Sequence, residues 1–323
     1  MSEVLPDFQL LQPSTVKEAV AVMSQDKSAR LCAGGTDLVV NMRRGLVDAE
    51  TLIDISAIAD LKRMKSGPTG LYIGAGVPLR ELAENTAIAK DYPAVTMACL
   101  SIAGPAHREV ATLGGNLCLD TRCLYYNQSH WWRQANNFCL KYQGDVCHVA
   151  PTKKICRAVF SGDLAPALMV HGAEAEIAGP GGQRRIALDA LYREDGMDYL
   201  RLEAAEIVIG VHLPPARAVS GYKKVRIRGA IDFPLAGVAV SCETVAPSSH
   251  RFSIAITGTN SCPVMVEMPE ALGADDPEVF FASLVKRVQV RVTPLRTTTT
   301  AANYRRLSVS ALAGKLAREL WAG

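Results

Sequence analysis

Short apolar runs separated by glycine and proline fill the first two thirds of the chain. Their lengths and spacing predict short strands alternating with short helices. Thr36 is the expected N-cap of the first of these helices, and Pro78 falls in the first turn of the next, where proline is tolerated. The strands are expected over residues 29–35 and 71–77, and the helices over 36–45, 78–85 and 92–104.

The pattern of apolar and polar residues changes near residue 215, where proline and glycine in residues 213–221 interrupt it. Three apolar, strand-like stretches follow, and then two helical ones. We therefore expect an α+β chain with two domains, residues 1–216 and residues 217–323. The expected C-terminal strands are 222–229, 236–245 and 251–259, and the expected helices are 276–289 and 303–321.

Composition narrows the class of protein. With 323 residues, 49% of them hydrophobic, the chain can bury sizeable cores. Its net charge of +3 and the absence of a long basic run argue against a nucleic-acid surface. No apolar run reaches the roughly 18 residues that span a bilayer, and the first residues lack a signal-peptide pattern. A cytoplasmic protein without a membrane segment is expected.

Two paired-glycine turns are candidates for binding a phosphate. Each is expected to bring backbone N–H groups close to a ligand, which a side chain in place of glycine would prevent. Either turn alone is also typical of an ordinary tight turn. A nicotinamide site at Gly74-Ala75-Gly76 is disfavoured because Leu79 occupies the third glycine position of that fingerprint. The two turns consist of Ala33, Gly34, Gly35, Thr36 and Asp37, and of Thr112, Leu113, Gly114, Gly115 and Asn116.

Four motifs in order give a specific resemblance. AGGTDL, TLGGNL, SGDLAPALMVHGAEAEI and YKKVRIRGAIDFPLAGVAV resemble the FAD-binding subunits of the molybdenum hydroxylases, the xanthine and carbon monoxide dehydrogenase family. The resemblance extends over nearly the whole chain. It implies a two-subdomain FAD-binding domain of the vanillyl-alcohol oxidase (PCMH) type, followed by a small α+β domain with a three-stranded sheet and helices.

The resemblance also assigns residues to the cofactor FAD. The backbone of both glycine turns is expected to surround the pyrophosphate. Asp163 matches an aspartate near the flavin end, and Lys224 matches a lysine that reaches the cofactor region. From the residues alone, Asp163 would be a turn residue and Lys224 a solvated charge on a strand. No catalytic acid or base is expected in this chain, because substrate chemistry would take place on a partner subunit.

Nine cysteines in a cytoplasmic chain are unlike a disulfide framework, because thiols there stay reduced. Cys118 directly follows the second glycine turn and is expected to be placed by packing. Residues 120–157 stand between two family motifs that usually lie close together. A loop of this length is uncommon unless something orders it, and four cysteines could do so by binding a metal centre. The predicted ligands are Cys123, Cys139, Cys147 and Cys156.

Spacing alone does not identify the metal. Fifteen, seven and eight residues separate the four cysteines, without the paired CxxC of most zinc ribbons. A zinc site using His130 or His148, or cysteines without a ligand, stays open. A surplus of positive charge favours an anionic [4Fe–4S] cluster, and the same basic face could steer an acidic ferredoxin. The surplus comes from Arg122, Arg133, Lys141, Lys153, Lys154 and Arg157 against Asp120 and Asp145.

The four-cysteine insertion resembles the 4-hydroxybenzoyl-CoA reductase branch of the family. That resemblance implies electron flow from ferredoxin through [4Fe–4S] and FAD to the [2Fe–2S] clusters of a small subunit. The molybdenum cofactor of a large subunit would then reductively dehydroxylate an aromatic thioester, within a dimer of heterotrimers. The alternative in the family is the FAD subunit of an oxidative enzyme, of xanthine or carbon monoxide dehydrogenase type, with a structural metal loop. Outside the family, a stand-alone flavin enzyme and a flavin-free zinc scaffold are further alternatives.

Overall fold

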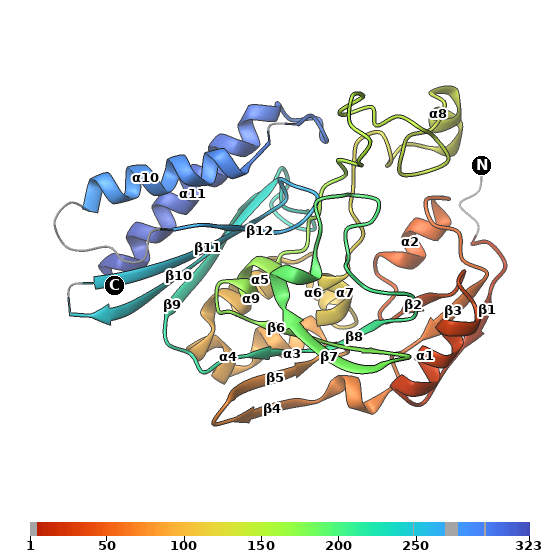
Figure 1. Cartoon of the computed structure of the whole chain (residues 1–323), viewed down its shortest axis with the longest axis horizontal. Coiled ribbons are helices and arrows are strands. Elements are labelled where there is room, and N and C mark those ends of the chain that lie inside the picture. Colours follow the sequence, from red (N-terminus) through yellow and green to blue (C-terminus); the bar gives the residue numbers. More distant parts are fainter. Residues whose placement is uncertain (1–4, 248, 269–276, 294) are drawn as a thin grey trace.

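The computed structural model describes residues 5–247, 249–268, 277–293 and 295–323. Its N-terminal part is a parallel sheet in the order β1-β3-β2, with α1 and α2 in the connections (Figure 1). Thr15 caps α1 by accepting a hydrogen bond from the N–H of Glu18. The elements are β1 (Gln9–Leu11), α1 (Val16–Gln25), β2 (Arg30–Cys32), α2 (Leu38–Arg43) and β3 (Thr51–Asp54).

An antiparallel five-stranded sheet follows, in the order β4-β5-β8-β6-β7. A large apolar core that includes Ile73, Val211 and Leu168 joins this sheet to a group of short helices. The strands are β4 (Met64–Gly67), β5 (Gly70–Gly74), β6 (Glu174–Gly179), β7 (Gly182–Ala187) and β8 (Ile207–Leu213). The helices are η1 (Ala59–Lys62), α3 (Leu79–Glu84), α4 (Thr86–Asp91), α5 (Pro93–Ser101), α6 (Pro105–Arg108), α7 (Leu113–Leu117), α8 (His130–Ala135), α9 (Leu164–Met169) and η2 (Leu188–Leu191).

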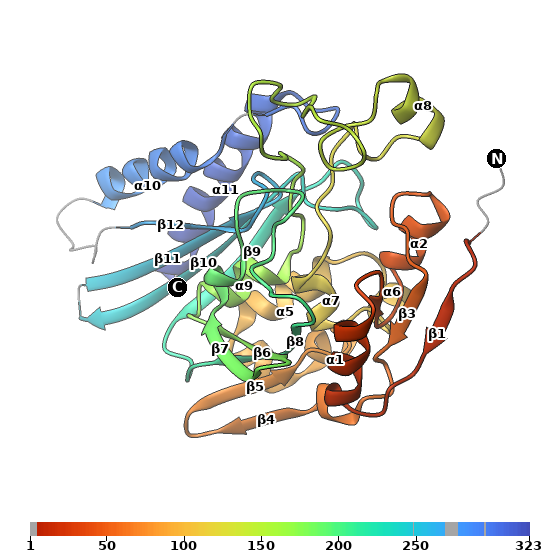
Figure 2. The same ribbon diagram turned by 45° about the vertical axis from the view of Figure 1, so that its right-hand side comes forward.

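The last sheet is antiparallel in the order β12-β11-β10-β9, and the first seven residues of its strand β10 are buried on both faces. Because side chains alternate along a strand, Val238 and Val240 of β10 join the core beneath α10 and α11, whereas Ala239 joins the core that contains α5 and α9. Figure 2 shows this layering. The elements are β9 (Val219–Val225), β10 (Ala236–Ala246), β11 (Ser249–Thr257), β12 (Val264–Val266), α10 (Pro277–Arg291) and α11 (Ala302–Ala322).

The predicted α+β class is confirmed, and the three expected C-terminal strands gain a short fourth one, β12. Asp276, the first residue of one expected helix, lies outside the described residues. The helix expected from Thr36 begins at Leu38, and its N-cap residue is Asp37, whose side chain makes no capping bond. The second glycine turn is helical, because Thr112 Oγ1 accepts a hydrogen bond from the N–H of Gly115. Within the described ranges, no helix is both long and apolar enough to cross a membrane.

A buried polar contact joins α5 and the residues after α9 to the C-terminal sheet. The Ser220 hydroxyl on β9 accepts a hydrogen bond from the N–H of Ala94 on α5. It also lies 3.0 Å from Nε2 of His171, just after α9. Burial lowers the pKa of His171 to about 4. The imidazole is therefore neutral in the fold at neutral pH.

The His171 contact predicts a dependence of stability on pH. The unfolded chain binds a proton at His171 below about pH 6.5, whereas the folded chain does so only near pH 4. Stability is therefore lost as the pH falls through this window. At pH 4.5 the free energy of unfolding should receive roughly 2 to 3 kcal/mol less from this group than at pH 7. In denaturant titrations, the free energy of unfolding of His171→Gln should differ between pH 4.5 and pH 7 by that much less than the free energy of unfolding of the wild type. Equal pH dependence in wild type and variant would contradict this, and exposed His130→Gln is the control.

Candidate functional site: two adjoining cavities

A cavity of about 1020 Å³ lies among the N-terminal sheet, the antiparallel sheet and the loop after β9. It exceeds the usual range for pockets that bind small ligands, which ends near 1,000 Å³. Its lining brings together residues far apart in the sequence, among them both glycine turns. Ten of the eleven predicted FAD-binding residues line it, namely Ala33, Gly34, Gly35, Thr36, Asp37, Thr112, Gly114, Gly115, Asn116 and Asp163.

The two glycines of the first turn are required for different reasons. A Cβ on Gly34 would lie 2.0 Å from the carbonyl oxygen of Val110, so only glycine allows the two backbones to approach. Gly35 has a φ of +66°, in the left-handed region that glycine favours. In the second turn, Asn116 Oδ1 accepts a hydrogen bond from the N–H of Leu164, which fixes α7 against α9. Both turns are thus held rigidly at the cavity wall.

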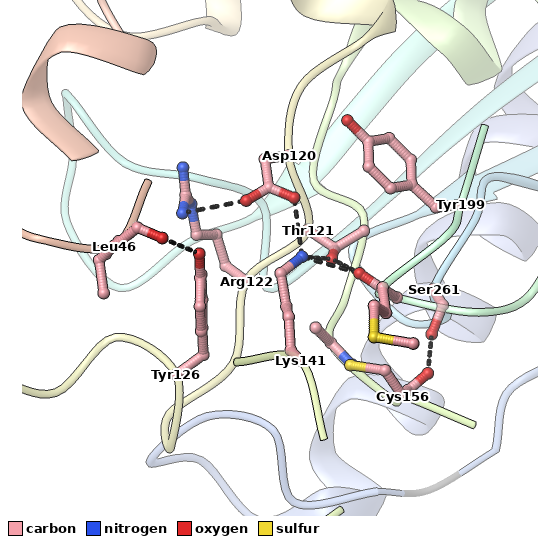
Figure 3. A network of polar contacts seen from close by, with 12 residues as sticks. Leu46, Asp120, Thr121, Arg122, Tyr126, Lys141, Cys156, Tyr199 and Ser261 are labelled. Atoms are coloured by element: carbon pink, nitrogen blue, oxygen red, sulfur yellow. Dashed lines mark hydrogen bonds and ion pairs between the residues drawn. The ribbon is translucent and has the colours of Figure 1, made fainter. Parts of the chain in front are cut away.

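Asp37 does not cap its helix, because its carboxylate binds Arg122. Both carboxylate oxygens accept from Nη2 of Arg122, at 2.9 and 2.8 Å. Asp120 lies 3.5 Å from Nη1 of the same arginine and accepts a 2.7 Å hydrogen bond from Lys141 Nζ (Figure 3). This chain of four alternating charges, here called the ion-pair chain, connects the first glycine turn to the segment that follows the second. The Asp37 side chain is thereby engaged by protein.

Asp163 is the buried centre of a polar cluster. Its Oδ1 lies 3.0 Å from Lys224 Nζ, and both side chains are 4% exposed. Tyr222 donates a 2.6 Å hydrogen bond to the same oxygen. Burial raises the pKa of Asp163, with Lys224 opposing the shift. Lys224, a solvated charge when judged from the residues alone, is thus a buried partner of Asp163 and does not itself line the cavity.

Tyr222 is the residue of this cluster that the sequence did not reveal. It stands two positions before Lys224 on β9, so both side chains lie on the same face of the sheet. Burial raises the pKa of Tyr222 well above its usual value, which keeps its hydroxyl a donor to Asp163. The spacing of two positions between Tyr222 and Lys224 was the only indication in the sequence that they share one face of a strand. Their burial depended on α5, which packs on β9.

The four predicted cysteine ligands line a second, small cavity of about 10 Å³. Cys123, Cys139, Cys147 and Cys156 are each 5 to 9% exposed, and all are free thiols. Burial raises the pKa of Cys123 to about 11 and that of Cys156 to about 12. Across the described part of the chain, no group of three or more His, Cys, Asp or Glu side chains is arranged to hold a metal ion.

The residues of the alternative ligand sets lie in different places. Cys118 lines the large cavity, in agreement with its exclusion from the set of four. His148 lines the small cavity, and its Nε2 contacts the carbonyl oxygen of Phe138. His130 is exposed and does not line this cavity. The four cysteines therefore share the lining of one small void with His148.

Residues 120–157, here called the four-cysteine segment, dock on two sides. Arg44 Nη2 donates to Asn127 O and Arg133 Nη2 donates to Gly45 O, each at 2.6 Å, at the end of α2. On the other side, the N–H of Leu124 donates to Thr297 O at 2.8 Å. In both ribbon views the segment lies between α2 and the C-terminal helices (Figures 1 and 2). It therefore bridges the N-terminal sheet and the C-terminal part.

The predicted basic face is mostly turned inward. Arg133 is 1% exposed, its Nε and Nη1 have no hydrogen-bond partner, and its guanidinium lies 4.4 Å from the Tyr142 ring centroid. Arg122, Lys141 and Arg157 are largely buried in ion pairs. Only Lys153 and Lys154 of the six are exposed. The expectation of a basic surface that steers ferredoxin is therefore not met by these six residues.

A further cation near the cysteines comes from far along the sequence. Arg305 of α11 is 3% exposed and donates through Nε to Leu235 O at 2.8 Å. Burial lowers the pKa of Arg305 to about 10, while the negative charge of a Cys123 thiolate would oppose that shift. Positive charge thus approaches the cysteines from α11 as well as from the four-cysteine segment. The sequence analysis did not find Arg305, because this residue lies far from the four cysteines along the chain.

Comparison with known proteins agrees with the geometry. The family described as the FAD binding domain in molybdopterin dehydrogenase matches residues 6–216. The aldehyde oxidoreductase FAD-binding subunit PaoB of Escherichia coli is 30% identical, with 72% of this chain and 76% of that protein covered. The carbon monoxide dehydrogenase medium chain of Afipia carboxidovorans is 26% identical, with 80% and 77% covered.

Solved structures share the fold. A chain of reconstituted CO dehydrogenase from Oligotropha carboxidovorans matches with a TM-score of 0.79 at 21% identity, and 99% of each chain is covered. A chain of quinoline 2-oxidoreductase from Pseudomonas putida 86 matches with a TM-score of 0.78 at 18% identity and 98% coverage of each. The PCMH-type fold expected from the four motifs is confirmed. With both glycine turns on one large cavity, the chain belongs to the family of FAD-binding domains of the molybdopterin dehydrogenases, as an FAD subunit of the molybdenum hydroxylases.

Proposed function

We propose that this chain is the FAD-carrying medium subunit of a multi-subunit molybdenum enzyme of the xanthine and carbon monoxide dehydrogenase type. The observation that carries the proposal is the large cavity, on which ten predicted FAD-binding residues converge. Bound FAD would supply a group that accepts and releases one or two electrons. The chain's own residues would bind it, orient it and shield it from water. None of them is assigned as a catalytic acid or base.

The pyrophosphate is proposed to lie against the backbone of residues 33–37 and 112–116. Glycine at positions 34, 35, 114 and 115 limits side-chain bulk at these turns, which supports a close approach. Asp163 is proposed at the flavin end, with Lys224 acting behind it through their ion pair. The glycine turns and Asp163 precede β9, whereas Lys224 lies on it. We therefore propose a domain boundary between residues 216 and 217, in the connection from β8 to β9.

The proposed partner subunits are inferred from the names of the related proteins. Those proteins are named as FAD-binding subunits or medium chains, which supports a large molybdenum subunit and a small [2Fe–2S] subunit as partners here. A dimer of heterotrimers remains the proposed assembly. The relatives are named dehydrogenases and oxidoreductases, which favours an oxidative enzyme over the reductive 4-hydroxybenzoyl-CoA type.

The second candidate is the reductive enzyme, with a [4Fe–4S] cluster in the four-cysteine segment and ferredoxin as donor. One observation favours it, namely that all four cysteines line one small void near buried cations. Four thiolates and an anionic cluster would be stabilised by Arg133, Lys141 and Arg305. The present void is only water-sized, so the four side chains would have to move outward around a cluster. A structural metal in the same place belongs to the oxidative alternative.

Metal and flavin analysis tests these two candidates. The anaerobically purified complex should contain one FAD per copy of this chain. Under the second candidate it should also contain, per copy of this chain, about four irons with matching acid-labile sulfide beyond those of the [2Fe–2S] subunit. Cys139→Ala with Cys147→Ala should then lose iron and keep FAD. Cys242→Ala, a buried cysteine of β10 remote from the segment, is the matched control. Stoichiometric zinc, or no metal beyond that of the partner subunits with FAD retained, would leave the oxidative candidate. Absence of FAD would contradict both.

A double-mutant cycle tests the proposed role of Asp163. Asp163→Asn leaves Lys224 charged and buried without its counter-charge, which should cost about 3 to 5 kcal/mol of unfolding free energy. Combining Asp163→Asn with Lys224→Met removes both charges and should recover a large part of that cost. Denaturant titration measures the stability, and flavin fluorescence quenching measures the affinity for FAD. Both Asp163 variants should bind FAD more weakly. FAD binding as tight as in wild type would contradict the assigned position of Asp163.

A further inference from the structure

Two residues line both cavities, Tyr126 and Lys141. The Tyr126 hydroxyl donates to the carbonyl oxygen of Leu46, and Lys141 Nζ lies 5.1 Å from the centroid of the Tyr126 ring. At this place one layer of side chains separates the four cysteines from the large cavity. Lys141 is therefore the ammonium group that borders both compartments.

The ammonium of Lys141 is held in one position. It donates to Asp120 Oδ1 and to Gly196 O, each at 2.7 Å, and to Thr121 Oγ1 (Figure 3). These three acceptors use its three N–H donors. The side chain is 7% exposed, so solvent screens its charge only weakly. Lys141 thus has no donor left for a ligand and acts on its surroundings as a fixed charge.

The ion-pair chain is electrically balanced. Lys141 and Arg122 carry two positive charges, and Asp120 and Asp37 carry two negative ones. Neutralising Lys141 would leave a net charge of −1 beside both cavities. Neutralising Lys141 and Asp120 together would restore the balance. The chain therefore offers its own control for a purely electrostatic effect.

We propose that Lys141 is a positioning residue that sets the reduction potential of the bound FAD through its fixed charge. The inference rests on the proposed function only in placing FAD in the large cavity. Reduction adds electrons to the flavin, and a nearby cation stabilises the more negative form. The same charge borders the four-cysteine cavity, so any redox centre bound there would be shifted in the same direction. The structural basis is the wall that Lys141 shares between the two cavities.

The test compares three variants of the chain in the purified complex. Lys141→Met keeps the length of the side chain and removes its charge, Asp120→Asn with Lys141→Met restores the charge balance, and exposed Lys154→Met is the control. Anaerobic spectroelectrochemical titration measures the flavin midpoint potential. Lys141→Met should lower it, the double variant should return it toward wild type, and the control should leave it unchanged. FAD binding should weaken about tenfold in Lys141→Met, which corresponds to about 1.4 kcal/mol.

The outcomes separate this inference from the proposed function. FAD bound with the same potential in wild type and Lys141→Met would overturn the inference and leave the proposed function standing. An equal shift in Lys141→Met and in the double variant would also overturn it, because the effect would then come from lost packing. Wild-type complex without FAD would overturn the proposed function itself.

Discussion

The ion pair between Asp37 and Arg122 is the contact on which the site depends most. It joins a residue of the first glycine turn to the start of the four-cysteine segment, 85 positions later in the sequence. Asp120 and Lys141 extend the link to the residues around Cys139. Without such a link, the segment would border the large cavity with unpaired charges. Because the charges are mostly buried, they compensate one another within the protein.

Buried charge recurs wherever separate parts of the chain meet. Asp163 and Lys224 pair between α9 and β9, and Arg305 of α11 approaches the cysteine segment. Each such group is costly to bury and stable only with its partner in place. These buried charges therefore favour one relative arrangement of the parts of the chain that they join. That property suits the proposed role of the chain, which is to hold FAD at a fixed position.

The sequence predicted those features that depend on local chemistry. Paired glycines marked both turns, and apolar periodicity marked α10 and α11. It could not predict that Asp37 binds Arg122 in place of capping a helix, or that Lys224 is buried, because both depend on partners far along the chain. Tyr222 and Arg305 were missed for the same reason. All four predicted cysteines line one small void, but a metal centre among them stays a prediction, and the inward direction of the nearby cations was not predicted.

The most direct test of the account is an experimental structure of the anaerobically purified complex, with anomalous scattering data at the iron and zinc edges. The account predicts FAD in the large cavity, with its pyrophosphate against residues 33–37 and 112–116 and Lys141 between the flavin and the four cysteines. A metal signal among the cysteines would identify the centre. FAD bound elsewhere, or a large cavity filled by a partner subunit, would contradict the account.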